Sequence, residues 1–186
     1  MRATEGSVHI WRADLTAIGD RPEQLLCSEE LARAARIVPE RKRVLWARSR
    51  GVLRALLGRY LDRDPRELRF VSGPHGKPAL RREEATEDLR FNMSHSGGLA
   101  LYSVTVGREV GVDIEHSRDR YTAEFLRAWV AHEAAVKCLG LGLATPPEDT
   151  QRDDLWSTQL DVGPRASAAL AVEGGRCDRR CREWRG

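Results

Sequence analysis

The first half of the chain shows a strand-like pattern, then a helical one, then strands again. Residues 7–13 alternate between apolar and polar side chains, as a half-buried strand does. Ser28 is followed by acidic residues and opens a predicted helix toward Ile37. Apolar residues recur at helical spacing over 41–61 and predict a long helix. Three strands are expected after it, at 68–71, 89–92 and 99–106.

The second half repeats this order. A strand is predicted at 110–115, a helix at 122–139 and a strand at 168–172. The polar, Arg-rich residues that follow are expected to fray. Because one order of elements occurs twice, the sequence predicts an α+β fold of two similar halves, 1–106 and 107–186.

Composition limits the classes of protein to which the chain can belong. Its 186 residues are 41% hydrophobic and 32% charged, which is enough for a packed core. No apolar run reaches the roughly 18 residues of a membrane helix, and the first residues lack a signal-peptide pattern, so a cytoplasmic protein without a membrane partner is expected. The four Cys residues match neither a disulfide framework nor a zinc site. A net charge of +3 is too small to indicate a nucleic-acid partner.

Lysine is scarce in this chain. Only three of the 31 basic residues are Lys, namely Lys42, Lys77 and Lys137. A chain that uses Arg almost everywhere can keep Lys where a compact ammonium is needed, since the two head groups are not interchangeable at a tight site. Chance retention explains the same three residues equally well.

Two carboxylates stand two residues apart in the predicted strand Gly111-Val112-Asp113-Ile114-Glu115. Since side chains alternate along a strand, Asp113 and Glu115 share one face while Val112 and Ile114 face the core. Paired carboxylate oxygens are ligands that Mg²⁺ accepts. A strand with one solvated face explains these residues without a metal.

The segment Asn92-Met93-Ser94-His95-Ser96 lies where a strand passes into polar residues and glycine. Hydroxyls, an imidazole and free backbone amides at such a place suit a phosphate. A hydrolase nucleophile is less well supported, because adjacent Ser and His rarely make that geometry and no Gly-x-Ser-x-Gly elbow is present. A structural turn is the remaining alternative.

Glu133 and Lys137 are four residues apart on the second predicted long helix and share a face with Val130. An exposed pair of this kind contributes only about 0.3–0.5 kcal/mol and has no functional meaning. A pair at the end of an apolar stripe instead points into a cleft. There Glu133 can join the two strand carboxylates around a metal, and Lys137 can reach a phosphate.

Taken in order along the chain, these pieces resemble the 4′-phosphopantetheinyl transferases of the Sfp type. The resemblance rests on four segments: Gly76-Lys77-Pro78, Phe91-Asn92-Met93-Ser94-His95-Ser96, Gly111-Val112-Asp113-Ile114-Glu115, and Trp129-x-x-His132-Glu133-Ala134-x-x-Lys137-x-x-Gly140-x-Gly142-Leu143. Weaker similarity runs from about Val8 to Val172. Each motif alone occurs in many unrelated proteins, whereas the four motifs in this order are specific for the family.

The resemblance implies a fold and a reaction. The fold is a pseudo-dimer of two α+β halves, each a long helix packed on a small antiparallel sheet, with coenzyme A bound in the cleft between them. The reaction transfers 4′-phosphopantetheine from coenzyme A to a serine of an apo acyl or peptidyl carrier protein and releases 3′,5′-adenosine bisphosphate. A monomer in bacterial secondary metabolism is expected.

The resemblance also implies roles for individual residues. By position, Asp113, Glu115 and Glu133 are expected to bind Mg²⁺. Glu133 is also the candidate base, and Lys137 is expected to act on the reacting phosphates. The expected coenzyme A contacts are Lys77, Ser94, His95, Lys42, Arg43 and Arg50, of which the last three are matched only approximately.

Two departures from the family pattern stand out. His132 replaces a Lys, which exchanges a permanent charge for one that titrates near neutrality. Only residues 116–128 separate Glu115 from Trp129, where the family has a longer stretch that covers the site and helps dock the carrier. These departures favour one alternative, a protein of the same fold that binds coenzyme A or a carrier without transferring anything. A nucleic-acid module on the Arg-rich helices is a third, weaker interpretation.

Overall fold

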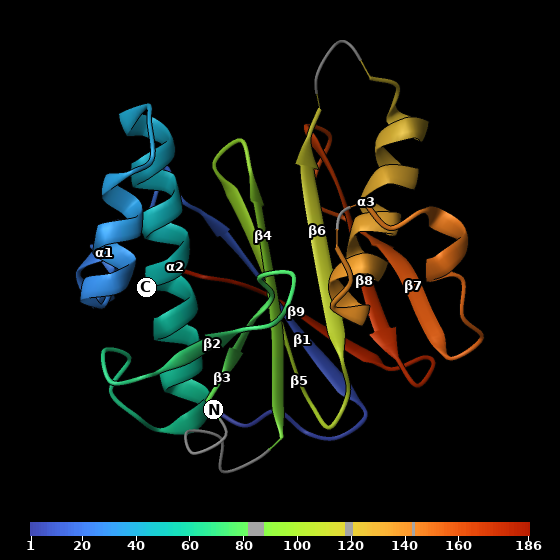
Figure 1. The fold of residues 1–186 in the computed structure, drawn as a ribbon, viewed down its shortest axis with the longest axis horizontal. Helices are drawn as coiled ribbons and strands as arrows, with labels where there is room; N and C mark the ends of the chain where they lie inside the picture. Colours follow the sequence, from blue (N-terminus) through green and yellow to red (C-terminus); the bar gives the residue numbers. More distant parts are fainter. Residues whose placement is uncertain (82–87, 118–120, 143) are drawn as a thin grey trace.

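The computed structural model describes residues 1–81, 88–117, 121–142 and 144–186, which form an α+β fold (Figure 1). The first half contains β1 (Ser7–Asp14), η1 (Pro22–Leu25), α1 (Ser28–Ala35), α2 (Glu40–Leu61), β2 (Phe70–Ser72), β3 (Pro78–Leu80), β4 (Leu89–Ser96) and β5 (Leu99–Val106). The second half contains β6 (Val110–His116), α3 (Ala123–Leu139), η2 (Pro147–Thr150), β7 (Leu155–Leu160), β8 (Ala166–Glu173) and β9 (Asp178–Glu183). The α+β class of the prediction is therefore confirmed.

Two main sheets organise these strands, and β2 pairs with β3 in a separate hairpin. The first sheet has the order β4-β5-β1-β9, and the second has the order β6-β8-β7. With β9 left aside, each sheet has three antiparallel strands, and the last of the three in sequence lies in the centre. With α1 and the β2–β3 hairpin also left aside, each half runs strand, long helix, strand, strand, with the same pairing.

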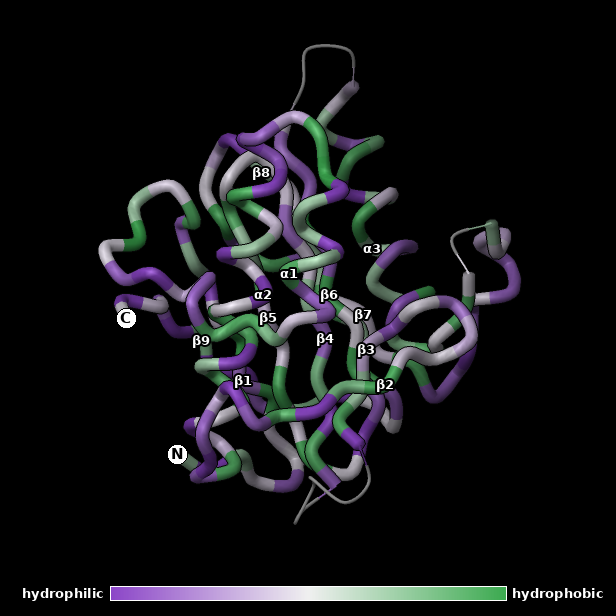
Figure 2. The backbone as a smooth tube through the Cα atoms, turned by 60° about the vertical axis from the view of Figure 1, so that its left-hand side comes forward, coloured by the Kyte–Doolittle hydropathy of each residue, from purple (hydrophilic) through white to green (hydrophobic). Residues whose placement is uncertain are grey.

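The sheets pack face to face, and one long helix covers the outer face of each. Alternation along β1 divides its side chains between two cores. Trp11 and Ala13 pack with α2, whereas Val8 and Ile10 pack with the second sheet. On the far side of that sheet, α3 packs its small residues against β8. Hydrophobic and hydrophilic residues alternate at short spacing along α3 (Figure 2), as expected for a helix with one buried face.

Gly51 in the middle of α2 is explained by a close approach. A Cβ atom at this position would overlap the backbone carbonyl of Pro22 in η1. Glycine weakens an isolated helix by about 1 kcal/mol relative to alanine. Here it allows η1 to lie directly against α2.

The structure corrects the sequence prediction at the C-terminal end, which was expected to fray. β9 pairs in parallel with β1, from Ser7 with Asp178 to Arg12 with Glu183. All six residues of β9 are exposed, so the strand is held by its backbone ladder and has no apolar face that a pattern could reveal. Because β9 joins the first sheet, it also crosses the predicted boundary between the halves.

Three smaller differences concern other elements. The strands β3 and β7 were not predicted, and Cys27, not Ser28, caps α1, with its backbone N–H 3.2 Å from Oε2 of Glu30. The short connection between β6 and α3 includes residues 118–120, which lie outside the described residues.

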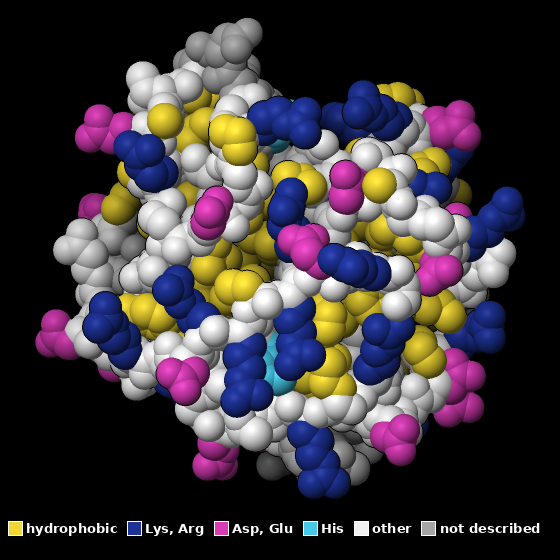
Figure 3. Space-filling model, turned by 180° about the vertical axis from the view of Figure 1, so that it is seen from behind, with side chains coloured by type: hydrophobic (Ala, Val, Ile, Leu, Met, Phe, Trp, Pro, Cys, Tyr) yellow, Lys and Arg dark blue, Asp and Glu magenta, His cyan; other side chains and the backbone are white. Residues whose placement is uncertain are grey.

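Within the described chain, no helix combines the length and the apolar character needed to cross a membrane. Seen from behind, Lys and Arg side chains are spread over the surface with Asp and Glu between them (Figure 3).

Candidate active site

Three of the sequence motifs converge where β4, β6 and α3 meet. Lys137 on α3 pairs with Oδ1 of Asp113 on β6. The same ammonium donates to Oγ of Ser94 on β4 at 3.2 Å, and this hydroxyl donates to Asp113 Oδ1 at 2.8 Å. Residues far apart in the sequence therefore form one connected group.

Side chains of β4 join it to β6, which lies beside it in Figure 1. Asn92 Oδ1 accepts a hydrogen bond from the backbone N–H of Val112 at 3.0 Å. Ser96 donates to Glu115 Oε2 at 3.0 Å and accepts from the N–H of His116 at 3.1 Å. The contacts of Asn92 and Ser96 with β6 were not predicted. Strand alternation could have found them, because residues 92, 94 and 96 share one face.

Gly111 brings α3 close to β6. A Cβ atom at this position would overlap the backbone carbonyl of Ala134 and the backbone nitrogen of Cys138. Only glycine allows the helix backbone to lie this close to the strand. The close approach places Lys137 within reach of Asp113.

The carboxylates of this group have too few hydrogen-bond donors and positive charges around them. Asp113 is 3% exposed, and its Oδ2 atom is buried without a hydrogen-bond partner among the described residues. Burial raises the pKa of Glu133, the Lys137 ammonium opposes this, and the Asp113 carboxylate adds to it. The site thus holds more buried acceptor capacity than its own donors satisfy.

A metal ion fits the donor set, although the carboxylates are not gathered around one point. Among the residues that the structure describes, no three His, Cys, Asp or Glu side chains form a metal-binding group. Lys137, not a second carboxylate, is the partner of Asp113. The Oδ2 atom of Asp113, which has no partner among the described residues, and the carboxylate of Glu133, whose pKa burial raises, are nevertheless oxygen donors of the kind that a hard cation accepts.

His95 lies at the exposed end of β4, next to Ser94. The surrounding protein displaces water from the ring and lowers its pKa, and the Lys137 charge lowers it further. Both effects disfavour the imidazolium form, so an anion bound nearby would restore the charge.

The structure does not bring the other predicted coenzyme A contacts into this group. Lys77 donates to Oε2 of Glu109 at 2.6 Å and to the carbonyl of Cys138 at 3.0 Å. Lys42 is exposed at the start of α2, and Arg43 pairs with Glu40 at 3.4 Å. Their proposed contacts remain predictions.

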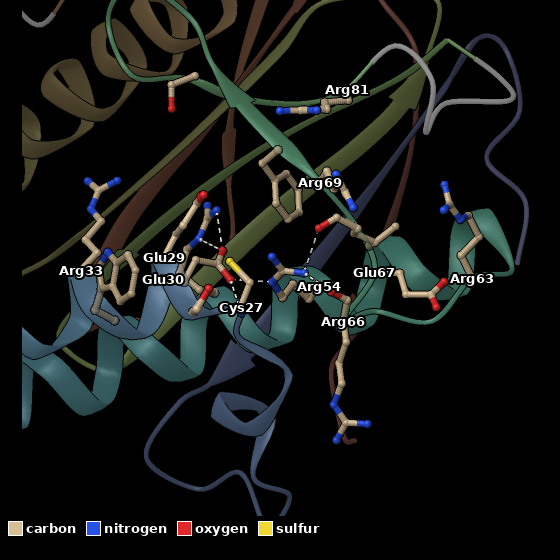
Figure 4. Close-up of a pocket in the computed structure, with 16 residues that line it drawn as sticks. Cys27, Glu29, Glu30, Arg33, Arg54, Arg63, Arg66, Glu67, Arg69 and Arg81 are labelled. Carbon is tan, nitrogen blue, oxygen red and sulfur yellow. Dashed lines mark hydrogen bonds and ion pairs between the residues drawn. The ribbon is translucent and has the colours of Figure 1, made fainter.

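Arg50 lies in a cavity of about 870 Å³ between α1, α2 and the segment leading into β2. Arginine side chains line the cavity from Arg33 at one end to Arg63 at the other (Figure 4). Arg50 also reaches Sδ of Met93, the residue before Ser94, at 3.8 Å. The cavity therefore adjoins the strand that carries the candidate site.

Fold and site together define an α+β protein in which a lysine, a serine and buried carboxylates converge beside a basic cavity. No family model matches the chain. It is, however, 33% identical to the 4′-phosphopantetheinyl transferase HetI of Nostoc sp. (strain PCC 7120), over 90% of this chain and 88% of HetI. It is 31% identical to slr0495 of Synechocystis sp. (strain PCC 6803), provisionally named a 4′-phosphopantetheinyl transferase, over 67% of this chain and 63% of that protein.

The chain therefore belongs to the 4′-phosphopantetheinyl transferase family, and the family resemblance of its motifs is confirmed. It is a transferase enzyme, and the group transferred to carrier proteins is phosphopantetheine. The alignment with HetI spans 213 positions, more than the 186 residues of this chain. HetI accordingly has residues inside the aligned region that this chain lacks.

Proposed function

We propose that the chain transfers 4′-phosphopantetheine from coenzyme A to a serine of an apo acyl or peptidyl carrier protein and releases 3′,5′-adenosine bisphosphate. The observation that carries this proposal is the convergence of Ser94, Asp113 and Lys137 in a member of this family. A lysine beside carboxylates is suited to a reaction in which charge develops on phosphate oxygens.

Asp113, Glu115 and Glu133 would hold Mg²⁺ in this proposal. Support comes from Asp113 Oδ2, which has no partner among the described residues, and from the pKa of Glu133, which burial raises and the carboxylates of Asp113 and Glu115 raise further. Mg²⁺ accepts a few protein oxygens of this kind and keeps several waters. When bound, the ion would neutralise charge on the pyrophosphate of coenzyme A.

Lys137 would contact the transferred phosphate. An ammonium has three N–H donors, and Asp113 and Ser94 engage two of them. The third is available for a phosphate oxygen. Ser94 and His95 would hold coenzyme A phosphates from β4, next to this ammonium.

Glu133 would accept the proton of the carrier serine. The serine oxygen forms a bond to the phosphorus that bears pantetheine, the bond from that phosphorus to the bridging oxygen breaks, and the adenosine bisphosphate leaves with the electron pair. Burial raises the pKa of Glu133 and makes it a stronger base than an exposed carboxylate. A base must also lie within hydrogen-bond reach of the proton that it takes.

The basic cavity is the proposed place for the adenosine end of coenzyme A. Arg50 lines it and approaches Met93 on β4, so one ligand can span the cavity and the Ser94 group. Arg43, Lys42 and Lys77 are proposed as additional phosphate contacts. Lys77 keeps one N–H free of its contacts with Glu109 and Cys138.

We further infer that the two halves, 1–106 and 107–186, are related as a pseudo-dimer with the ligand cleft between them. The shared order of elements and the shared central position of the last strand support this relation. β9 is an addition to the first sheet that has no counterpart in the second.

Intact-mass spectrometry tests the proposed function. An apo carrier protein is incubated with coenzyme A, Mg²⁺ and the enzyme, and the carrier should gain the mass of one phosphopantetheine group. EDTA should prevent the gain. The alternative that the sequence leaves open, binding without transfer, predicts coenzyme A binding by calorimetry and no mass gain with any carrier.

A further inference from the structure

Three aromatic side chains stack in a row on the surface at the start of α3. The rings of Tyr121 and Phe125 have centroids 5.1 Å apart and planes inclined by 19°. Those of Phe125 and Trp129 have centroids 6.3 Å apart and planes inclined by 16°. The residues are 39%, 48% and 43% exposed, respectively. We call Tyr121, Phe125 and Trp129 the aromatic ladder.

Exposure of this kind is unusual for such side chains. Large aromatic residues normally bury most of their surface, and single exposed hydrophobic residues need no explanation. The other large exposed hydrophobic residues in the described chain are aliphatic: Met1, Leu31, Val38, Val44 and Val71. Rings in contact with one another form a continuous apolar surface, and aromatic residues are enriched where proteins bind partners.

The ladder leads into the candidate active site. Phe125, Trp129, Glu133 and Lys137 follow one another at intervals of four residues, so they form a single ridge along α3. At 1.5 Å per residue, the ridge from Phe125 to Lys137 is roughly 18 Å long. Its first two members are exposed rings, and its last member, Lys137, pairs with Asp113. Whatever binds the ladder lies next to the proposed reacting groups.

We propose that the aromatic ladder is the docking surface for the apo carrier protein and receives apolar side chains of the carrier next to its acceptor serine. This inference rests on the proposed function, because the serine must reach Glu133 and Lys137 at the far end of the same ridge. A second copy of the chain fits less well. It would cover the end of the ridge nearest the site and obstruct the carrier.

The ladder stands where the chain enters α3. Tyr121 directly precedes Thr122, the N-cap of the helix, and Phe125 and Trp129 lie in its first two turns. Rigid aromatic rings offer a large contact area at a low cost in conformational entropy.

Calorimetry with purified apo acyl and apo peptidyl carrier proteins tests the proposal, using the variants Phe125→Ser and Trp129→Ser. The dissociation constant for a carrier that the wild type binds should rise by at least about tenfold in each variant. The dissociation constant for coenzyme A should stay within about twofold of the wild-type value, because the variants leave the phosphate contacts intact. Trp129→Phe keeps an aromatic ring and should restore most of the carrier affinity. Leu31→Ser, an exposed hydrophobic residue on α1, is the matched control and should change neither constant.

The outcomes separate this proposal from the proposed function. If the wild type binds a carrier, and the variants lose that binding, the ladder is the docking surface even when no phosphopantetheine is transferred. Unchanged carrier affinity in both serine variants would overturn the proposal that the ladder is the docking surface. A wild type that binds no carrier in the set would overturn it as well. Loss of wild-type self-association in the variants, with carrier affinity unchanged, would identify the ladder as an interface between copies and would also overturn it.

Discussion

The molecule buries two charged clusters, one between α1 and α2 and one where β4, β6 and α3 meet, and they differ in how completely their carboxylates are paired. In the first, both carboxylate oxygens of Glu30 are paired, Oε1 with Arg50 at 3.0 Å and Oε2 with Arg54 at 2.6 Å. In the second, Oδ1 of Asp113 accepts from both Lys137 and Ser94, whereas Oδ2 is buried without a partner among the described residues. We call the first the closed cluster and the second the open cluster, because the second keeps an acceptor that a ligand can satisfy.

The pKa values of Glu30 and Glu133 shift in opposite directions, in keeping with this difference. Burial by itself would raise the pKa of Glu30, but the hydrogen bond from Arg54 and the charge of Arg50 outweigh it and hold the pKa below its usual range. For Glu133, burial raises the pKa and Lys137 does not compensate fully. A carboxylate whose charge remains uncompensated is where function is expected.

The largest effect is expected from Asp113→Asn. The amide keeps the size of the side chain but removes the negative charge from the open cluster. Transfer of phosphopantetheine should fall by at least about 1,000-fold in a variant that is still folded at the assay temperature. Intact-mass rates and thermal unfolding of the same preparation measure both. A variant that retains wild-type turnover would remove Asp113 from the proposed site.

The matching change in the closed cluster is Glu30→Gln, and its effect should appear in stability. The variant leaves two guanidinium groups without their carboxylate, so the free energy of unfolding should fall by about 3 kcal/mol. Urea unfolding measures it. Glu29→Gln, at the exposed neighbouring position, is the control and should stay within about 0.5 kcal/mol of the wild type. Equal stability of the Glu30 and Glu29 variants would show that the closed cluster does not stabilise the fold.

The glycines of the two halves sharpen the comparison further. Replacing Gly by Ala inside a helix usually stabilises it by up to about 1 kcal/mol. Gly51→Ala should instead destabilise the protein by about 1–3 kcal/mol, because the new Cβ overlaps the carbonyl of Pro22. Gly111→Ala should cost a similar amount and should also reduce transfer, because it pushes α3 away from Asp113. A stabilised Gly51→Ala would contradict the close approach of η1.

How far the sequence alone predicts the molecule depends on what holds each element. The helix at 41–61 and the strand at 99–106 have a repeating apolar pattern and were predicted to within one residue. β9 has six exposed residues and is held by pairing with β1, a partner more than 160 positions away along the chain. No local pattern contains that information.

The candidate site shows the same division. Asp113, Lys137 and Ser94 could be proposed because each lies in a recognisable motif, and the structure brings them together. The hydrogen bonds of Asn92 and Ser96 form only because β4 and β6 lie side by side. Lys77 binds the carbonyl of Cys138 only because the last turn of α3 lies next to it. Such contacts follow from tertiary packing, which a single sequence leaves open.

The smallest effect concerns acid stability, and it again separates the two clusters. The pKa of Glu30 is lower in the folded protein than its ordinary value of 4.5, so its pairing stabilises the fold above that pH. This contribution is lost as the pH falls through the folded-state pKa, where the unfolded chain already binds the proton. Urea unfolding at a series of pH values from neutrality down to 3 should therefore show a steeper loss of stability below pH 4.5 in the wild type than in Glu30→Gln. Parallel curves would mean that Glu30 titrates alike in the folded and the unfolded state.

The raised pKa of Glu133 predicts the opposite sign for that group, since a proton bound more tightly in the folded state favours folding as the pH falls. Glu133→Gln should accordingly make the acid loss of stability steeper than in the wild type, which distinguishes the open cluster from the closed one in a single set of titrations.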